Sequence, residues 1–522
     1  MAATNPRTPF ANEPFTDFSR EADRRAMQDA LRTVHGQFGK RYQLIIGGER
    51  YSTPEHFASS NPSRKGEIIG YFCKPTTDHA EKAMQAALKT FDAWSEVDAS
   101  KRADMIFKAA GIMRRRKFEL AAWLIYEVGK SWAEADADVA EAIDFCDFYA
   151  REMLRLADEQ PLTRVAGERN ELHYIPLGVG AVIPPWNFPL AILCGMTSAA
   201  VVAGNTVVLK PSSDAPTIAY RFMEVLEEAG MPAGVVNFIT GPGAEIGDYL
   251  VQHPMTRFVA FTGSRDVGLG ISEKAARPRK GQIWIKRSIL EMGGKDAIMV
   301  AADADLDAAA EGVVSSAFGY SGQKCSACSR AIVDASIYEP FIEKLVARTR
   351  SIVVGDPADP GTVMGPVVNE KALGKIMSYI ETGRTEGRIV SGGEPGPTDG
   401  HYVQPTIFAD VDGRARLAQE EIFGPVLAVI KCRDFEDGLR IVNDTEYGLT
   451  GSVYTASPKN VEAAKRRFHV GNLYINRKCT GALVGAHPFG GFNMSGTDSK
   501  AGGRDYLLLF TQAKVISRKI TG

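Results

Sequence analysis

The sequence predicts an α/β protein with two units, each built on a parallel sheet covered by helices. From residue 178, short β-branched or apolar runs alternate with helix-length segments, and a second alternation runs from residue 295 to about 480. Strands that alternate with helices pair in parallel, because each helix returns the chain to the same end of the sheet. We therefore expect a Rossmann-like first unit and a second α/β unit.

The composition is that of a soluble globular protein large enough for more than one core. The chain has 522 residues, of which 44% are hydrophobic and 24% are charged, and its formal net charge is −2. Such a small charge creates no field that attracts nucleic acid or an anionic membrane. We interpret the basic run Arg114-Arg115-Arg116 as a solvated helix face rather than a DNA contact.

Several features predict a reducing, cytoplasmic location. The seven cysteines are odd in number and lack paired spacing, which favours free thiols over a disulfide scaffold. The N-terminus lacks an apolar stretch of signal-peptide length. The apolar stretch from Leu190 to Leu209 contains Gly204 and Asn205, so a buried helix, a turn and a buried strand fit it better than a membrane span. We expect no membrane and no nucleic-acid partner.

The elements of the first unit follow from periodicity and residue type. Residues 1–39 are assigned to a helical N-terminal extension. Residues 79–158 are expected to form successive amphipathic helices, because Ala137 to Leu156 keeps apolar residues three and four apart. The expected strands are Val179–Ile183, Thr206–Leu209, Val235–Thr240, Phe258–Thr262 and Ile283–Leu290.

Two further segments lie outside this alternation. Pro161 to Pro176 alternates weakly around Gly167-Glu168-Arg169-Asn170, which predicts a hairpin with a polar tip. Tyr506 to Arg518 is predicted to be a strand. Because an isolated hairpin is only marginally stable, we expect these segments to pair across a subunit boundary in a homo-oligomer.

Two short segments carry the residues of a covalent enzyme. Cys325 lies among small residues beside the cation of Lys324, and Glu291 ends an apolar run before two glycines. A thiol attacks a carbonyl carbon, and a carboxylate can later activate the water that releases the acyl group. Lys324 would favour the thiolate, as would a helix N-terminus if one opens at Gly322-Gln323.

The spacing of Cys325 and Cys328 also fits a CxxC redox or zinc motif. A structural zinc would need a second Cys or His pair, and none with suitable spacing is near, so we expect no metal site. A redox pair would lock the nucleophile in a disulfide. A catalytic thiol is therefore the favoured interpretation of Cys325.

The segment Pro184-Pro185-Trp186-Asn187-Phe188-Pro189 directly follows an expected strand. Its prolines fix the backbone, and Asn187 supplies an amide at the carboxyl end of the strand, where α/β sites open. An amide directed at a developing oxyanion contributes about 3–4 kcal/mol. A turn asparagine that bonds to its own backbone is the alternative. The presence of Cys325 and Glu291 favours the catalytic interpretation.

Three segments are candidates for a dinucleotide site. One follows a strand with a glycine and a serine and should open a helix, whose N-terminus can hold a pyrophosphate. A second ends a strand in a lysine that can reach ribose hydroxyls, and the serine after it has helix capping as its alternative role. A third offers a carboxylate and an aromatic ring, suited to ribose and nicotinamide. The candidate residues are Lys210, Ser213, Gly263, Ser264, Gly268, Glu421 and Phe423.

These segments, in this order, resemble the aldehyde dehydrogenase superfamily from about residue 40 to the C-terminus. The resemblance implies that Cys325 is the nucleophile and Glu291 the general base of deacylation. It also implies an oxyanion hole made by Asn187 and the backbone N–H of Cys325. The cofactor NAD(P) would be held by Pro185, Trp186, Lys210, Ser213, Gly263, Ser264, Gly268, Glu421 and Phe423.

The same resemblance implies a domain organisation and a cofactor preference. It assigns residues 40–158 and 178–289 to an NAD(P)-binding domain, 290–490 to a catalytic domain, and 159–177 with 500–522 to a β-hairpin oligomerisation arm. NAD-selective members carry a glutamate where this chain has Ser213. Without that carboxylate a 2′-phosphate is not repelled, so we expect NAD to be preferred and NADP to be tolerated.

Two segments bring the resemblance closest to the branch that oxidises L-glutamate γ-semialdehyde, formed from 1-pyrroline-5-carboxylate, to glutamate in proline catabolism. They are residues 322–330 and 475–485, extended by 488–496. This branch must bind a free carboxylate, and small residues let an anion approach backbone N–H groups. The implied substrate contacts are Ser326, Gly481, Ala482, Phe188 and Phe489, with Glu141 for the ammonium and Lys324 for long-range attraction.

Some bacterial relatives in this branch are fused to proline dehydrogenase, and the chain is too short for such a fusion. We therefore expect a monofunctional enzyme, as a dimer or a trimer of dimers, that can channel substrate from a separate proline dehydrogenase. The alternatives are another semialdehyde or aliphatic aldehyde as substrate, or an inactive structural relative. Transfer of the acyl group to coenzyme A is disfavoured, because Glu291 is present to recruit water.

Overall fold

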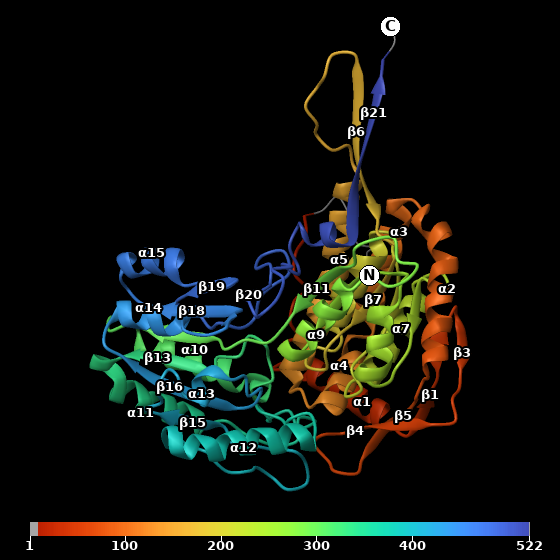
Figure 1. The fold of residues 1–522 in the computed structure, drawn as a ribbon. Helices are drawn as coiled ribbons and strands as arrows, with labels where there is room; N and C mark the ends of the chain where they lie inside the picture. The colour runs from red at the N-terminus through yellow and green to blue at the C-terminus, as the bar shows by residue number, and fades with distance from the viewer. Residues whose placement is uncertain (1–8, 521–522) are drawn as a thin grey trace.

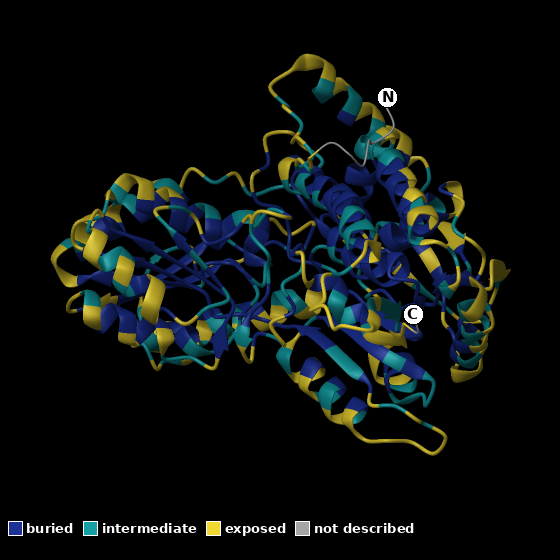
Figure 2. Cartoon of the chain, turned by 90° about the horizontal axis from the view of Figure 1, so that it is seen from above, coloured by how far each residue is buried: buried dark blue, intermediate teal, exposed yellow. Residues whose placement is uncertain are grey.

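The computed structural model describes residues 9–520, which form two lobes and a projecting arm (Figure 1). Each lobe is built around a seven-stranded sheet. Buried residues follow the sheets and the helices packed on them, and exposed residues lie on outer helices and loops (Figure 2). The predicted α/β architecture with two parallel-sheet units is confirmed.

The first sheet places five parallel strands beside an antiparallel edge pair. Its strands lie in the order β11 (Arg287–Glu291), β10 (Thr256–Thr262), β7 (Val179–Ile183), β8 (Thr206–Leu209), β9 (Val236–Phe238), β2 (Leu44–Ile46) and β3 (Glu49–Tyr51). β7 to β11 pair in parallel, and β2 and β3 run antiparallel. The strand order reverses between β7 and β10, and α/β proteins bind ligands at such a switch point.

The second sheet has the same character. Its strands lie in the order β14 (Arg388–Ser391), β15 (Thr406–Ala409), β16 (Val426–Cys432), β13 (Arg330–Asp334), β12 (Ala297–Val300), β18 (Thr450–Tyr454) and β19 (Asn472–Ile475). All neighbours pair in parallel except β14, which runs antiparallel to β15. Smaller sheets comprise β1 (Lys40–Tyr42), β5 (Ile68–Cys73) and β4 (His56–Ser60), and β17 (Tyr447–Gly448) with β20 (Phe492–Asn493).

Helices cover both sheets. The first lobe contains α1 (Glu21–His35), α2 (Thr77–Ser95), α3 (Ala99–Arg115), α4 (Lys117–Val128), α5 (Trp132–Ala157), α6 (Ala191–Val202), α7 (Pro216–Glu228), α8 (Asp248–Gln252) and α9 (Arg265–Ala276). The second contains α10 (Leu306–Phe318), α11 (Tyr338–Thr349), α12 (Glu370–Glu386), α13 (Arg416–Gln419), α14 (Phe435–Asn443) and α15 (Pro458–Arg467). Within residues 9–520 no helix combines the length and the apolar character that crossing a membrane requires.

The stretch from Leu190 to Leu209 forms the predicted buried helix, turn and strand. Helix α6 is apolar on all sides and almost every residue in it is buried. The chain turns at Gly204, where φ is +96°, and enters β8. Asn205 fixes this turn, because its side-chain oxygen accepts from the backbone N–H groups of Leu177 and Gly178.

The arm differs from the prediction. Residues 161–176 do not form a local hairpin; instead β6 (Glu168–Pro176) pairs antiparallel with β21 (Thr511–Lys519) over nine residue pairs (Figure 1). The predicted hairpin is therefore wrong, because the C-terminal segment supplies a longer partner than residues 161–167 offer. The predicted C-terminal strand begins only at Thr511, since Tyr506–Phe510 forms a 3₁₀ turn.

Two other predictions also need correction. The strand predicted over Ile283–Leu290 begins only at Arg287, because residues 283–286 form no ladder with β10 and the Trp284 indole N–H donates to the Thr256 carbonyl oxygen instead. Ile283 and Ile285 are instead 86% and 89% exposed. The helical extension predicted for residues 1–39 is a helix only from Glu21 to His35, and residues 1–8 lie outside the described part of the chain.

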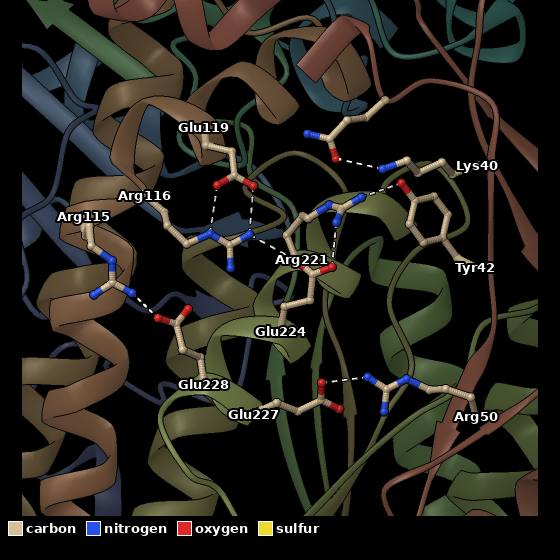
Figure 3. Close-up of polar contacts among 11 residues, drawn as sticks. Lys40, Tyr42, Arg50, Arg115, Arg116, Glu119, Arg221, Glu224, Glu227 and Glu228 are labelled. Atoms are coloured by element: carbon tan, nitrogen blue, oxygen red, sulfur yellow. Dashed lines mark hydrogen bonds and ion pairs between the residues drawn. The ribbon is translucent and has the colours of Figure 1, made fainter. Parts of the chain in front are cut away.

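The basic run at residues 114–116 is not the solvated face that the sequence predicted. Figure 3 shows Arg116 bonded to Glu119 and Glu224, and Arg115 bonded to Glu228. Arg116 is only 17% exposed, whereas Arg115 is 55% exposed. These pairs tie the junction of α3 and α4 to helix α7. The exposed Arg115–Glu228 pair contributes less than about 1 kcal/mol, whereas the half-buried Arg116 holds Glu119 and Glu224 together.

We expect Gly180→Ala to destabilise the first lobe by about 1–3 kcal/mol, because overpacking forces buried neighbours to move. A Cβ at Gly180 would lie 2.0 Å from the ring of Phe258, which is fully buried. The control is Gly111→Ala in α3, where a Cβ meets no atom within 4 Å. Denaturant midpoints should fall for the first variant and not for the second. An unchanged midpoint for Gly180→Ala would contradict this packing.

Candidate active site

The ends of three neighbouring strands bring predicted site residues to one edge of the first sheet. β10 and β11 pair Thr262 with Glu291, and β7 and β10 pair Ile183 with Phe261. Asn187 follows β7, and Gly263 follows β10. Since the strands are parallel, these residues lie at the same carboxyl edge, beside the switch point.

Cys325 comes from the second lobe, in a loop between the short turn Gly319–Gly322 and β13. The Nδ2 atom of Asn187 donates to the carbonyl oxygen of Gln323 at 3.1 Å, and both residues are buried. The amide therefore reaches the loop two residues before the thiol. Asn187 and Cys325, predicted to act together, lie at the same junction of the two lobes.

Two predicted sources of thiolate at Cys325 are wrong. No helix opens at Gly322-Gln323, because Tyr320 and Ser321 have φ values of 50° and 56° and the chain turns back there. The Nζ atom of Lys324 pairs with Oε1 of Glu134 at 2.6 Å. The pKa of Cys325 is instead raised well above its ordinary value, first by burial and then by nearby carboxylates that include Glu291.

Cys328 does not form a redox pair with Cys325. All seven cysteines are free. Cys328 is buried, and its thiol donates to the carbonyl oxygen of Arg330 at 3.4 Å. Cys479 donates to the carbonyl oxygen of Ser326 at 3.4 Å. Cys328 and Cys479 therefore help to fix the loop that holds Cys325.

Glu291 is buried at the end of β11, with one oxygen bonded and one free. The hydroxyl of Ser499 donates to Oε1, and Oε2 has no hydrogen-bond partner within the described residues. Burial raises the pKa of Glu291 to about 8, although Ser499 and Lys500 act against this shift. A carboxyl group with this pKa can take up a proton near neutral pH, as a general base must. The sequence did not point to Ser499.

Lys210 and Ser213 lie together after β8. The Nζ atom of Lys210 donates to the carbonyl oxygens of Pro211 and Gly241 at 3.1 and 3.0 Å. The Ser213 hydroxyl reaches the Gly241 oxygen at 3.5 Å. Burial lowers the pKa of Lys210 to about 8. A buried ammonium group beside a hydroxyl is suited to bind ribose hydroxyls.

The N-terminus of α9 fits a pyrophosphate. Ser264 precedes the helix, and its side chain makes no capping bond, so the first N–H groups of α9 have no side-chain acceptor. A Cβ at Gly263 would come within 2.5 Å of Phe261. Packing also favours glycine at position 268, because a Cβ there would lie 2.4 Å from the sulfur of Met292. These small residues let α9 lie close to the end of β11.

Groups from both lobes meet at the proposed nicotinamide side. The rings of Trp186 and Phe423 lie edge to face with centroids 5.5 Å apart. The Oε1 atom of Glu421 accepts from the Gly294 N–H at 3.1 Å. Gly293 leaves room for this carboxylate, because a Cβ there would lie 2.1 Å from it. Pro185 directly precedes Trp186 in the same loop.

The loop at residues 480–482 is attached to the Cys325 loop through the Cys479 thiol. Gly481 has φ of +76°, which favours glycine, and Ala482 follows it. The Arg477 guanidinium donates to the carbonyl oxygens of Thr480 and Gly481, both at 3.1 Å. With its carbonyls bonded in this way, the loop can present its N–H groups to an anion. Arg477 was not predicted from the sequence.

Helix α5 contributes a row of acidic residues to the same region. Glu134, Asp138 and Glu141 lie on one face of α5, at intervals of four and three residues. Burial raises the pKa of Glu141 to about 8, with further contributions from Asp138 and Asp144. The spacing of these three acids is visible in the sequence, but only Glu141 was predicted to contact the substrate.

A buried lysine completes this region. The Nζ atom of Lys130 lies 3.4 Å from Asp138 and 3.9 Å from the centre of the Phe188 ring. It also lies 4.1 Å from the Tyr320 ring. Lys130 therefore fixes Phe188, a predicted substrate contact. Phe489, the other predicted aromatic contact, is half-buried, and its backbone pairs with Ala501.

Comparisons with known proteins identify similar chains. The chain is 57% identical over 509 residues to the 1-pyrroline-5-carboxylate dehydrogenase of Geobacillus thermodenitrificans. The matched residues make up 98% of this chain and 99% of that relative. The chain is also similar to the structure of 1-pyrroline-5-carboxylate dehydrogenase from Thermus with bound NAD, with 51% identity, a TM-score of 0.97, and coverage of 98% of this chain and 99% of that one.

Proline utilization A from Bdellovibrio bacteriovorus is similar as well, at 46% identity and a TM-score of 0.97, and the match covers 98% of this chain and 53% of that protein. The aldehyde dehydrogenase family matches residues 50–516. This match spans most of the sequence and includes Cys325, Glu291 and Asn187. The chain belongs to the aldehyde dehydrogenase family.

Proposed function

We propose that this enzyme oxidises L-glutamate γ-semialdehyde, the open form of 1-pyrroline-5-carboxylate, to L-glutamate, with NAD as cofactor. The observation that carries the proposal is the meeting of a buried amide, a thiol and a buried carboxylate beside a loop suited to an anion. High identity to relatives named 1-pyrroline-5-carboxylate dehydrogenase supports the same substrate.

Cys325 attacks the aldehyde carbon after its proton passes to Glu291, the nearby carboxylate with a pKa of about 8. The carbonyl oxygen then becomes an oxyanion. The Cys325 backbone N–H and the second N–H of Asn187 stabilise this charge, since the first bonds to Gln323. A bound NAD would supply the acceptor for the hydride that leaves the carbon, and an acyl group would then remain on the Cys325 sulfur as a thioester.

Glu291 releases the Cys325 proton to solvent and, as a carboxylate again, takes a proton from water, while the water oxygen adds to the thioester carbon. The C–S bond breaks, the sulfur takes the proton back from Glu291 so that the thiol is restored, and glutamate leaves. The carboxylate oxygen of Glu291 without a partner is the group that holds the proton in this step. The Ser499 hydroxyl keeps the other oxygen in place.

The substrate carboxylate would bind at the backbone N–H groups of Gly481 and Ala482 and the hydroxyl of Ser326. Hydrogen bonds to a charged group contribute about 1.5–3 kcal/mol each, so three of them discriminate against an uncharged aldehyde. Glu141 would bind the ammonium group, and this positive charge would favour the ionised form of the Glu141 carboxyl group. Lys324 attracts the carboxylate from a distance while its pair with Glu134 fixes α5.

NAD would lie along the carboxyl edge of the first sheet. The ribose would be held by Lys210 and the pyrophosphate by the N-terminus of α9 with Ser264. Trp186, Glu421 and Phe423 would surround the nicotinamide end. Ser213 carries no charge that repels a 2′-phosphate, so we propose that NADP is used less well but measurably.

We also propose a homo-oligomer, as a dimer or trimer of dimers, that forms through the arm. The arm exposes the apolar side chains of Val515, Ile516 and Ile520, which a second copy would cover. Seven free cysteines support a cytoplasmic location. The likeness to half of proline utilization A supports transfer of substrate from a separate proline dehydrogenase.

NADH formation from pyrroline-5-carboxylate tests the proposed function. The wild-type enzyme should act on it with kcat/KM at least tenfold above that for succinic semialdehyde or hexanal, because carboxylate and ammonium contacts add. Cys325→Ser should reduce turnover by more than about a thousandfold, since a hydroxyl is a far weaker nucleophile. Cofactor binding, followed by fluorescence, should remain. Equal use of all three aldehydes would contradict the assignment of substrate.

Glu291→Gln should slow deacylation by about 10²–10⁴-fold, the usual contribution of a general base. Because the pKa of Glu291 is raised to about 8, the ionised base increases as pH rises, so wild-type deacylation should accelerate up to about pH 8 and then level off. Because the same carboxylate also deprotonates Cys325, the variant should form NADH slowly even in the first turnover, and its pH profile should be flat above pH 6. Rapid-mixing absorbance measures both. If the deacylation rate of the variant rose with pH as steeply as that of the wild-type enzyme, Glu291 would not be the base.

Ser213→Glu should reduce kcat/KM for NADP by more than about tenfold, because a carboxylate near the 2′-phosphate costs at least 1.4 kcal/mol at short range. Activity with NAD should change less than threefold. The matched control is Ser212→Glu, which adds the same charge one residue earlier. If wild-type enzyme could not use NADP at any concentration, the proposed tolerance would be wrong.

A further inference from the structure

The N-terminal strap, defined as residues 10–16, runs along α5 before the first helix begins. It is bonded to α5 at two places. The backbone N–H of Glu13 donates to Oδ1 of Asp144 at 2.7 Å, and the N–H of Thr16 donates to Oδ2 of Asp136 at 2.8 Å. Neither bond is explained by the reaction, yet both aspartates are buried.

Asn12 joins this strap to a third segment. Its Nδ2 atom donates to Oδ2 of Asp144 at 2.8 Å and to the carbonyl oxygen of Val484 at 3.0 Å. An amide nitrogen carries two hydrogens, so both are used. One side chain therefore bridges helix α5 and the loop that follows Gly481.

The ends of this bridge lie close to the two proposed recognition groups. Asp144 is three residues after Glu141, about one turn along the same helix. Val484 is two residues after Ala482. The strap also packs here, because the Phe10 and Phe148 rings meet edge to face at 5.2 Å.

The turn after Val484 is shaped to receive the strap. Gly485 has φ of +78°, and a Cβ there would lie 3.2 Å from Phe10 and 3.1 Å from Phe148. A larger residue would push the loop away from Phe10. Hydrogen bonds and packing thus hold the loop against α5 at the same place.

We infer that Asn12 is a positioning residue for substrate specificity, which fixes the distance between the carboxylate-binding loop and the helix that bears Glu141. The inference rests on the proposed function. A substrate with both an ammonium and a carboxylate group binds well only if Glu141 and the carboxylate-binding loop are held at a fixed distance from each other. An aldehyde without these charges needs neither partner, so Asn12 affects selectivity and leaves the chemistry at Cys325 unchanged.

The experiment compares Asn12→Ala and Asn12→Asp with wild type, using glutamate semialdehyde and propanal. For Asn12→Ala we expect KM for the semialdehyde to rise about tenfold, the effect of weakening one charged hydrogen bond, with kcat unchanged. Asn12→Asp should raise the KM for the semialdehyde further, because the introduced carboxylate would face the Asp144 carboxylate. Kinetics with propanal and the KM for NAD should stay within twofold of wild type.

Glu13→Gln is the matched control. It removes the ion pair between Glu13 and Arg114 at 2.6 Å but keeps the backbone bond to Asp144. The strap is therefore loosened from α3 without losing the bridge to the loop. This variant should keep the wild-type KM for the semialdehyde, and thermal unfolding is measured for all variants.

Three results would overturn the inference: an equal loss with both aldehydes, no change in KM for the semialdehyde in either Asn12 variant, or the same change in Glu13→Gln. The proposed function is tested separately by wild type in the same assay. If wild type showed no preference for the semialdehyde over propanal, the substrate assignment itself would fail.

Discussion

The hydrogen bond from the Asn187 amide to the Gln323 carbonyl is the contact on which the active site depends. Neither lobe holds a complete reaction centre, because Glu291 and Asn187 extend from the first sheet and Cys325 precedes a strand of the second. Breaking a bond between buried groups leaves a donor unpaired, which costs about 1–3 kcal/mol. The bond therefore favours the arrangement of the lobes in which thiol, amide and carboxylate meet.

Much of the fold could be predicted because its signals are local. β7 and β8 have the bounds expected from their β-branched runs, since a buried parallel strand is recognisable from its own composition. The arm could not be predicted in this way. The partner of β6 is β21, more than 300 residues later; the family resemblance grouped the two segments in one arm, but no feature of residues 161–176 by itself indicates this pairing.

The active site likewise combines features that local sequence predicts with features that depend on distant segments. Residue type and neighbouring glycines were enough to select Cys325, Glu291 and Asn187 as candidates that the structure brings together. Their electrostatic environment was not predictable, because it depends on distant segments. Lys324 is adjacent to Cys325 in sequence but pairs with Glu134, and Glu291 bonds to Ser499, 208 residues away. Chain proximity to a cation is therefore a poor guide to the charge state of a thiol.

The raised pKa of Cys325 changes how its reactivity should be understood. A permanently ionised thiolate would be nucleophilic, but it would also be open to oxidation, since both reactions involve the same form. A half-buried thiol that keeps its proton is less open to oxidation between turnovers and requires a base when the aldehyde arrives. Glu291 meets this need because burial raises its own pKa to about 8, which makes it a stronger base than an ordinary carboxylate. Burial thus raises the pKa of both the Cys325 thiol, which gives up the proton, and the Glu291 carboxyl group, which receives it.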